Sequence, residues 1–254
     1  MRYLILVSVF GAATFCAISP ARAADETEHI ARTVALEADG TLRLKSFSGR
    51  VTITATDRKD VSIDAVRRAP RERLDAIKLD IRTEGSHAVV IDANHREHSW
   101  YGFPRHDDVV ETDFDIQVPR RTNLDVSVFS APVTTTAIDG AQKVHSFGSR
   151  LRLDDAAGSI EAHTFSGPVE VHERSWQAGQ RISVNTFSGD IELHLPASAQ
   201  ADVIFDSFSG HLDSAAPLTL NSSSRRAMRA RLGAGGGGEL KLKTFSGNVR
   251  IEVR

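Results

Sequence analysis

A short phrase, Phe-Ser-Gly preceded by Ser or Thr, recurs along this chain and constrains its fold more than any other feature. Around each copy, apolar and polar residues alternate with the period of a half-buried β-strand. Seven copies, two of them worn, lie at 46–49, 128–131, 146–149, 164–167, 186–189, 207–210 and 244–247. Repetition of this kind indicates a repeat architecture rather than a mixed globular core.

The spacing of the copies suggests how the chain winds. Successive phenylalanines are 82, 18, 18, 22, 21 and 37 residues apart, and the two long gaps leave room for further degenerate coils. About 18 residues at roughly 3.3 Å each trace one flattened turn of about 60 Å. The sequence therefore predicts an all-β, single-chain β-solenoid with coils of 18–22 residues. An antiparallel β-sandwich is the alternative, although it does not explain the repeated corner.

The Ser-Gly pair of each copy is turn chemistry, because glycine accepts a positive φ without steric cost. We expect these glycines to form corners that line up along the solenoid: Gly49, Gly167, Gly189, Gly210 and Gly247. The serines before them are interpreted as turn formers. No G-x-S-x-G elbow surrounds them, so they are not expected to be nucleophiles.

The first 23 residues are typical of a secretory signal peptide, with a basic start at Arg2, an apolar run over 3–18 and an A-x-A site at 21–23. Residues 24–254 are expected to form one solenoid domain, with a polar lead-in over 24–33 and one or two helical turns over 69–76. Irregular inserts are predicted near 94–108 and 217–238, the second with a short basic helix.

Composition narrows the class of protein. The formal net charge is −2, and basic residues mostly alternate with acids along the strands, so no nucleic-acid partner is expected. The one cysteine, Cys16, lies inside the signal segment. An exported mature chain without disulfides or a transmembrane anchor favours the periplasm or cell surface of a Gram-negative bacterium.

The direction of the repeated phenylalanines follows from parity. Ile182 and Val184 alternate on the apolar face, which puts Phe187 on the polar face with Asn185. Coils about 4.8 Å apart would bring the outward rings of all copies into aromatic stacking range. Alternatively, the corner breaks the alternation, and the rings fold inward or lie flat over the turns as a stabilising ladder.

An uncovered row would exceed the apolar patch of an ordinary monomer and would mark a docking surface for a protein, a glycan or a second copy. Aromatic residues of the 94–108 loop either cap the solenoid or contact a ligand. The candidate binding residues are Phe129, Phe147, Phe165, Phe187 and Phe208 of the row and Trp100 and Tyr101 of the loop.

Candidate metal and catalytic residues are weaker. The loop histidines His95, His98 and His106, with Asp107 and Asp108, lack a convincing ligand spacing. The acids Glu170, Asp190 and Glu192 occupy ordinary solvent-facing strand positions, although solenoid polysaccharide-cleaving enzymes use such carboxylates. We therefore expect no catalytic residue, no metal and no cofactor.

Strands punctuated by Ser-Gly-x-Val, and the turn Val118-Pro119-Arg120-Arg121 leading into Leu124-Asp125-Val126-Ser127-Val128, make the chain similar to a bacterial family. It resembles the putative-adhesin family of β-strand-repeat domains of unknown function. The resemblance implies a β-solenoid on the envelope side and supplies no catalytic motif. The functional hypothesis is an exported, non-enzymatic adhesin-like or scaffold module that binds an unidentified envelope protein or glycan, with self-association possible. A carbohydrate-active solenoid enzyme is the alternative.

Overall fold

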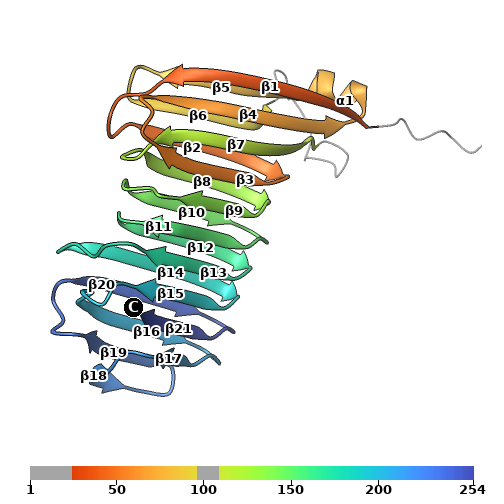
Figure 1. Ribbon diagram of the computed structural model, residues 1–254. Coiled ribbons are helices and arrows are strands. Elements are labelled where there is room, and N and C mark those ends of the chain that lie inside the picture. Colours follow the sequence, from red (N-terminus) through yellow and green to blue (C-terminus); the bar gives the residue numbers. More distant parts are fainter. Residues whose placement is uncertain (1–24, 96–108) are drawn as a thin grey trace, which may run out of the picture.

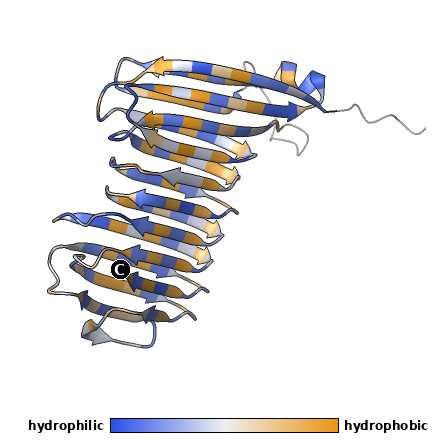
Figure 2. Cartoon of the chain, in the orientation of Figure 1, coloured by the Kyte–Doolittle hydropathy of each residue, from blue (hydrophilic) through white to orange (hydrophobic). Residues whose placement is uncertain are grey.

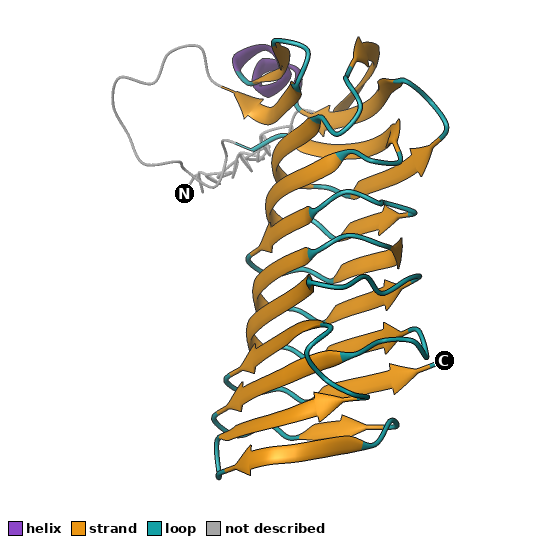
Figure 3. Cartoon of the chain, turned by 90° about the vertical axis from the view of Figure 1, so that its left-hand side faces the viewer, coloured by secondary structure: helices purple, strands orange, loops and turns teal. Residues whose placement is uncertain are grey.

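The computed structural model describes residues 25–95 and 109–254, which form an elongated stack of β-strands in two facing sheets (Figures 1 and 3). Within these residues the only helix is α1 (Arg71–Ala76), near one end of the stack, where helical turns were predicted. The signal peptide predicted over 1–23 lies outside the described residues.

The sheet that carries the phenylalanines, called the ladder sheet, has eleven strands. In spatial order they are β18 (Leu218–Ser223), β19 (Ala227–Leu232), β16 (Ala201–Ser207), β20 (Gly238–Thr244), β14 (Gln180–Ser188), β12 (Ile160–Ser166), β10 (Gln142–Ser146), β8 (Asn123–Ser130), β2 (Thr41–Ser48), β6 (Ala88–His95) and β5 (Lys78–Glu84).

The other sheet, called the opposite sheet, has ten strands. In spatial order they are β1 (Glu26–Ala35), β4 (Asp60–Ala69), β7 (Glu111–Pro119), β3 (Val51–Thr56), β9 (Val133–Thr136), β11 (Leu151–Ala156), β13 (Val169–Glu173), β15 (Ile191–Leu195), β21 (Val249–Val253) and β17 (Leu212–Ser214).

A coil consists of one ladder-sheet strand, a Ser-Gly corner and one strand of the opposite sheet. Neighbouring coils pair in parallel and in register, as in Val144 with Ala162 and Val169 with Ile191. The predicted β-solenoid is therefore confirmed. Its core lies between the sheets, where alternate residues such as Leu42, Leu44 and Ile53 are fully buried. Figure 2 shows the corresponding alternation of hydrophobic and hydrophilic residues along the strands.

The glycine corners line up, as predicted, because adjacent coils approach too closely for a side chain. A Cβ on Gly189 would lie 2.1 Å from the carbonyl oxygen of Gly167, and one on Gly247 would lie 2.1 Å from that of Gly189. Gly210 continues the row against Gly247 at 1.7 Å. Gly49 joins it at the other end, where its neighbour Ser48 pairs with Ser130.

The order of the coils in the stack differs from the order in the sequence at both ends. The β20–β21 coil lies between the β14–β15 and β16–β17 coils, although it follows both in the chain. Likewise β2 and β3 lie between β6–β7 and β8–β9. The long gaps in the repeat therefore correspond to chain that leaves the stack and returns, rather than to extra coils between neighbouring copies.

Antiparallel strands close both ends of the stack. Residues 217–238 were expected to hold a short basic helix, but they form the antiparallel strands β18 and β19. The physical reason is that Ala230 and Leu232 are buried while Arg229 and Arg231 face out, a period of two that the basic composition obscured. The lead-in predicted over 24–33 is also wrong, since β1 pairs with β4 from Glu26 onward. Its side chains are mostly exposed, so it lacks the apolar alternation of a core strand.

The close approach at the corners predicts a strong position effect for added methyl groups. Gly189→Ala should lower the free energy of unfolding by about 1–3 kcal/mol, because the new Cβ overlaps a carbonyl oxygen that belongs to the hydrogen-bonded backbone. Gly148→Ala is the matched control, since a Cβ there has no neighbour within 4 Å, and it should stay within about 0.5 kcal/mol of the parent. Urea unfolding followed by circular dichroism measures both. Equal effects would contradict the corner packing.

The inserted C-terminal coil predicts which cysteine pairs can form a disulfide. Ser183 pairs with Lys241, which in turn pairs with Ile204. In a Cys16→Ser background, Ser183→Cys with Lys241→Cys should oxidise readily, because adjacent strands are about 4.8 Å apart. Ser183→Cys with Ile204→Cys should not, because a strand separates the two positions. Mass spectrometry of the oxidised proteins decides, and the reverse outcome would mean that the coils stack in sequence order.

Candidate functional site

Seven phenylalanines form a continuous stack along the ladder sheet, called the phenylalanine ladder. Ring centroids of neighbours are 4.6–5.0 Å apart, and the ring planes differ by 1–15°. The order along the stack is Phe47, Phe129, Phe147, Phe165, Phe187, Phe245 and Phe208. The predicted stacking is therefore present, with Phe245 inserted out of sequence order.

Backbone hydrogen bonds between coils set the ring spacing. The amide of Ser166 donates to the carbonyl oxygen of Phe147 at 2.8 Å, and the amide of Ser246 donates to that of Phe187 at 3.0 Å. These bonds hold the Cα atoms that carry the rings at the strand separation. Each stacked pair contributes about 0.5–1.5 kcal/mol beyond the area it buries.

The ladder faces outward, as parity predicted. Its rings are 36–50% exposed, against 0–2% for the inward-facing neighbours Val184 and Thr186. The alternative in which the rings fold into the core is therefore wrong. The rings nevertheless bury each other's faces, so the ladder also stabilises the stack.

The ladder borders a groove of about 1110 Å³ on the outer face of the ladder sheet. Beside the rings runs a polar column formed by the residue two positions before each phenylalanine. From one end to the other it consists of Lys45, Ser127, His145, His163, Asn185, Lys243 and Asp206. Asp92 and Asn94 line the groove near Phe47, and Arg226 lies over the ring of Phe208 at 4.1 Å.

Charge along the polar column is concentrated at its ends. The rings of His145 and His163 stack at 5.0 Å in the middle. Burial, together with the nearby His163 and Lys143, lowers the pKa of His145, so this imidazole is neutral at pH 7. The groove therefore has a neutral centre, with Lys45 at one end and Asp206 at the other.

The stacking decides what the ladder can contact. Each internal ring presents its faces to its neighbours and only its edges to solvent, because the planes are nearly parallel at less than 5.1 Å. A sugar that packs on an aromatic face has no free face along the row. The continuous strip of ring edges is instead suited to another flat apolar surface.

The other candidate residues lie elsewhere. Trp100, Tyr101, His98, His106, Asp107 and Asp108 are outside the described residues. Glu170, Asp190 and Glu192 are remote from the groove, on or beside the opposite sheet. Asp190 accepts a hydrogen bond from the amide of Asn248 at 2.8 Å, which gives it a structural role.

Sequence reasoning missed one cluster on the opposite sheet. Glu-x-His occurs at 170–172 and again at 192–194, one coil later, so the two histidines pair in register. This repeat was the available signal, and each copy alone reads as an ordinary polar strand face.

One carboxyl group has the raised pKa that a general acid requires, but it lies inside the solenoid. Glu173 is 7% exposed, accepts a hydrogen bond from the side-chain amide of Gln180, and has a second carboxyl oxygen without a hydrogen-bond partner. Burial raises its pKa to about 8. Its position on the inward face of β13, away from the groove, indicates a buried polar group of the core.

Glu173 predicts a pH dependence of stability. The folded state keeps its proton up to about pH 8, whereas the unfolded state loses it near pH 4.5, so stability falls as the pH rises between these values. The loss is roughly 1.4 kcal/mol per pH unit. Glu173→Gln should remove it and melt higher than the parent at pH 8. The exposed Glu161→Gln should leave the slope unchanged. A parent slope that survives in Glu173→Gln would contradict this assignment.

The geometry defines a class: an elongated β-solenoid with an exposed aromatic docking face. Residues 141–252 match the family model described as Toastrack DUF4097, so the chain contains a Toastrack DUF4097 domain. The resemblance to the putative-adhesin family of unknown function is thereby confirmed. The comparison with curated proteins finds no match.

Two solved structures are similar in fold. A putative cell adhesion protein from Clostridium sporogenes aligns over 90% of this chain and 100% of its own, with 10% identity and a TM-score of 0.53. A putative adhesin from Bacteroides fragilis aligns over 89% and 97%, with 11% identity and a TM-score of 0.36. The first supports the solenoid architecture. Within the described residues, no helix has the length and apolar character needed to cross a bilayer.

Proposed function

We propose that this protein is an exported, non-enzymatic, adhesin-like module whose contact surface is the phenylalanine ladder and whose partner is the ladder of a second copy. The observation that carries the proposal is the row of seven stacked and half-exposed rings. Export is supported by the signal-peptide pattern of residues 1–23. A binding role is also consistent with the adhesin names of the structures similar in fold.

The apolar area of the ladder is of the size that an interface requires. The exposed parts of the seven side chains add up to about three whole phenylalanines, or about 600 Å². This is at the upper end of the largest patch on an ordinary monomer. It also approaches the roughly 800 Å² per partner of a stable interface, with the polar column available as a rim.

Charge complementarity favours a second copy in antiparallel orientation. A twofold axis through Phe165, the middle ring, would place Lys45 of one copy opposite Asp206 of the other. The same operation brings Arg226 near Asp92 at both ends of the groove. A parallel arrangement would instead bring Lys45 against Lys45. Opposite charges at the rim select orientation and partner, and isologous pairing of one surface is the commonest form of assembly.

The flatness of the ladder also suits a second ladder. Rings less than 5.1 Å apart leave no space for a foreign side chain between them, so contact is made across a plane of edges. Two such planes are mutually complementary without a deep pocket. The contact would be adhesive and reversible, because its apolar area is below that of obligate dimers.

Analytical ultracentrifugation of the protein without residues 1–23 tests the proposal. The parent should dimerise with increasing concentration, and Phe147→Ser with Phe165→Ser should weaken dimerisation at least about tenfold, since central aromatic residues dominate interfaces. Leu220→Ser is the control, because Leu220 is 59% exposed on β18 and absent from the groove. Circular dichroism confirms that each variant is folded.

A charge swap tests the orientation. Arg226→Asp alone should weaken the dimer, and Arg226→Asp combined with Asp92→Arg should restore it. A parent that stays monomeric at all concentrations, or a dimer unaffected by the phenylalanine substitutions, would overturn the self-association. Stable binding of a purified glycan by a monomeric parent would favour the glycan alternative instead.

A further inference from the structure

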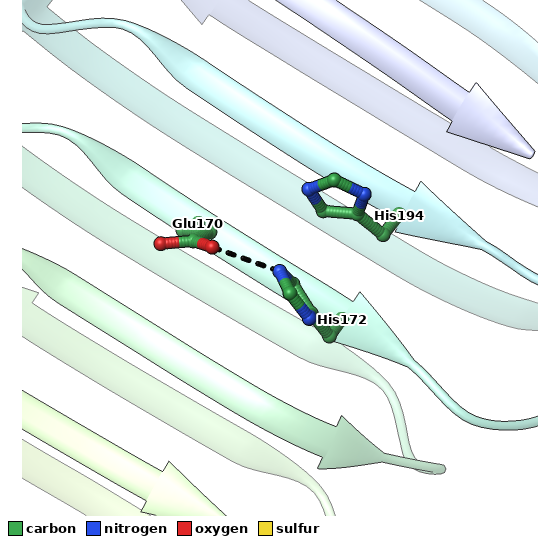
Figure 4. Close-up of side chains that lie close together, drawn as sticks. All are labelled: Glu170, His172 and His194. Carbon is green, nitrogen blue, oxygen red and sulfur yellow. Dashed lines mark hydrogen bonds and ion pairs between the residues drawn. The ribbon is translucent and has the colours of Figure 1, made fainter.

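The cluster of histidines and carboxylates on the outer face of the opposite sheet is independent of the ladder. His172 on β13 and His194 on β15 pair in register, and their ring centroids are 4.1 Å apart. Figure 4 shows both rings on adjacent strands, with Glu170 directed toward His172. His172 Nε2 lies 2.8 Å from Glu170 Oε1. Glu252 on β21 pairs in register with His194 and extends the cluster by one coil.

His194 has more carboxylates around it than a neutral imidazole can satisfy. Its Nε2 is 3.1 Å from Glu192 Oε1, and its Nδ1 is 3.1 Å from Glu252 Oε2. A neutral ring carries a single N–H, so one nitrogen lone pair faces a carboxylate oxygen. Placing a positive charge on both rings of the pair would set two cations 4.1 Å apart. A cation shared by the two imidazoles and the carboxylates satisfies all of these groups.

Buried atoms without partners point to the same place. The side chain of His194 is 10% exposed, and its Nδ1 makes no hydrogen bond with adequate geometry despite the short distance to Glu252. Asp154 Oδ1, which lies 3.6 Å from His172 Nδ1, is also buried without a hydrogen bond. Buried polar atoms are normally paired, so orphaned ones on both sides of a histidine pair indicate a missing ligand.

We propose that Glu170, His172 and His194 bind one Zn²⁺ ion across adjacent coils. Two imidazoles and one carboxylate form a donor set that zinc accepts. The ligand atoms lie within 4.8 Å of one another. A tetrahedral site with bonds of 2.0–2.1 Å has ligand atoms about 3.3 Å apart, so shifts of about 1 Å complete it.

The neighbouring groups fit the roles that surround a zinc site. A carboxylate beside the free nitrogen of a ligating histidine fixes its ring, and Glu192 and Glu252 flank His194 in this way. Arg152 is hydrogen-bonded to Glu170 at 2.7 Å and holds that carboxylate in place. Three protein ligands leave a fourth position for water or for a donor from a partner.

The molecule contains its own control for this arrangement. Glu161 and His163 form the same Glu-x-His motif on β12, with His145 stacked on the neighbouring strand at 5.0 Å. No ligand cluster arises around that pair within the described residues. The difference is the additional carboxylates of Asp154, Glu192 and Glu252, which only the opposite sheet supplies.

Isothermal titration with ZnCl₂ into the metal-free protein without residues 1–23 tests the site. The parent and His163→Ala should each bind one equivalent, whereas His172→Ala and His194→Ala should bind about 100-fold more weakly or worse. Zinc should raise the melting temperature of the first two only, because it binds the folded state. His194 is buried, so circular dichroism checks its variant. If that variant unfolds, His172→Ala, at a half-buried position, decides.

The outcomes separate the zinc site from a simple ion-pair cluster. Absence of zinc binding by the parent, or undiminished binding by His172→Ala, would overturn the proposal. Equal loss in His163→Ala would place the metal on the ladder sheet and would also overturn it. Dimerisation through the ladder is measured separately, so failure of either proposal leaves the other standing.

Discussion

Parallel, in-register hydrogen bonding between successive coils is the constraint on which the rest of the structure depends. It fixes every residue of one coil about one strand spacing from its counterpart in the next. Glycines at the corner therefore meet glycines or carbonyl oxygens, phenylalanines meet phenylalanines, and histidines meet histidines. A motif of four residues thus becomes a surface that extends along the whole stack.

The same constraint acts differently on apolar and charged residues. A column of identical apolar rings gains stacking energy at every step, whereas a column of identical charges would repel itself. The outward columns therefore mix their charges, as where Arg152 lies 2.7 Å from Glu170 of the next coil and Lys243 lies beside Asp206. Only Phe is repeated without variation through all seven coils of the ladder. On the opposite sheet, the in-register pair His172 and His194 is surrounded by carboxylates, an arrangement that a cation would relieve.

The sequence predicted the features that depend on local periodicity. The alternation around Phe187 gave both the solenoid and the outward direction of the ring, and Ser-Gly gave the aligned corners. It could not give the stacking order, because nothing local states that Leu240 pairs with both Ile182 and Val203. Antiparallel end strands such as β1 and β19 were missed since one lacks an apolar alternation and the other hides it among arginines. The histidine cluster depends on pairing across coils, which a single strand does not reveal.

The inserted coil connects fold and site most closely. Phe187 and Phe208 are 21 residues apart in the chain, a spacing that would allow them to stack directly, yet Phe245 separates them. The ladder is therefore continuous only when β20 has paired with both β14 and β16, on its two sides. Before that pairing, two strands expose unpaired backbone edges, which favour association with other chains. Closing this slot protects the backbone and completes the aromatic surface in one step, so an intact docking face reports a fully folded solenoid.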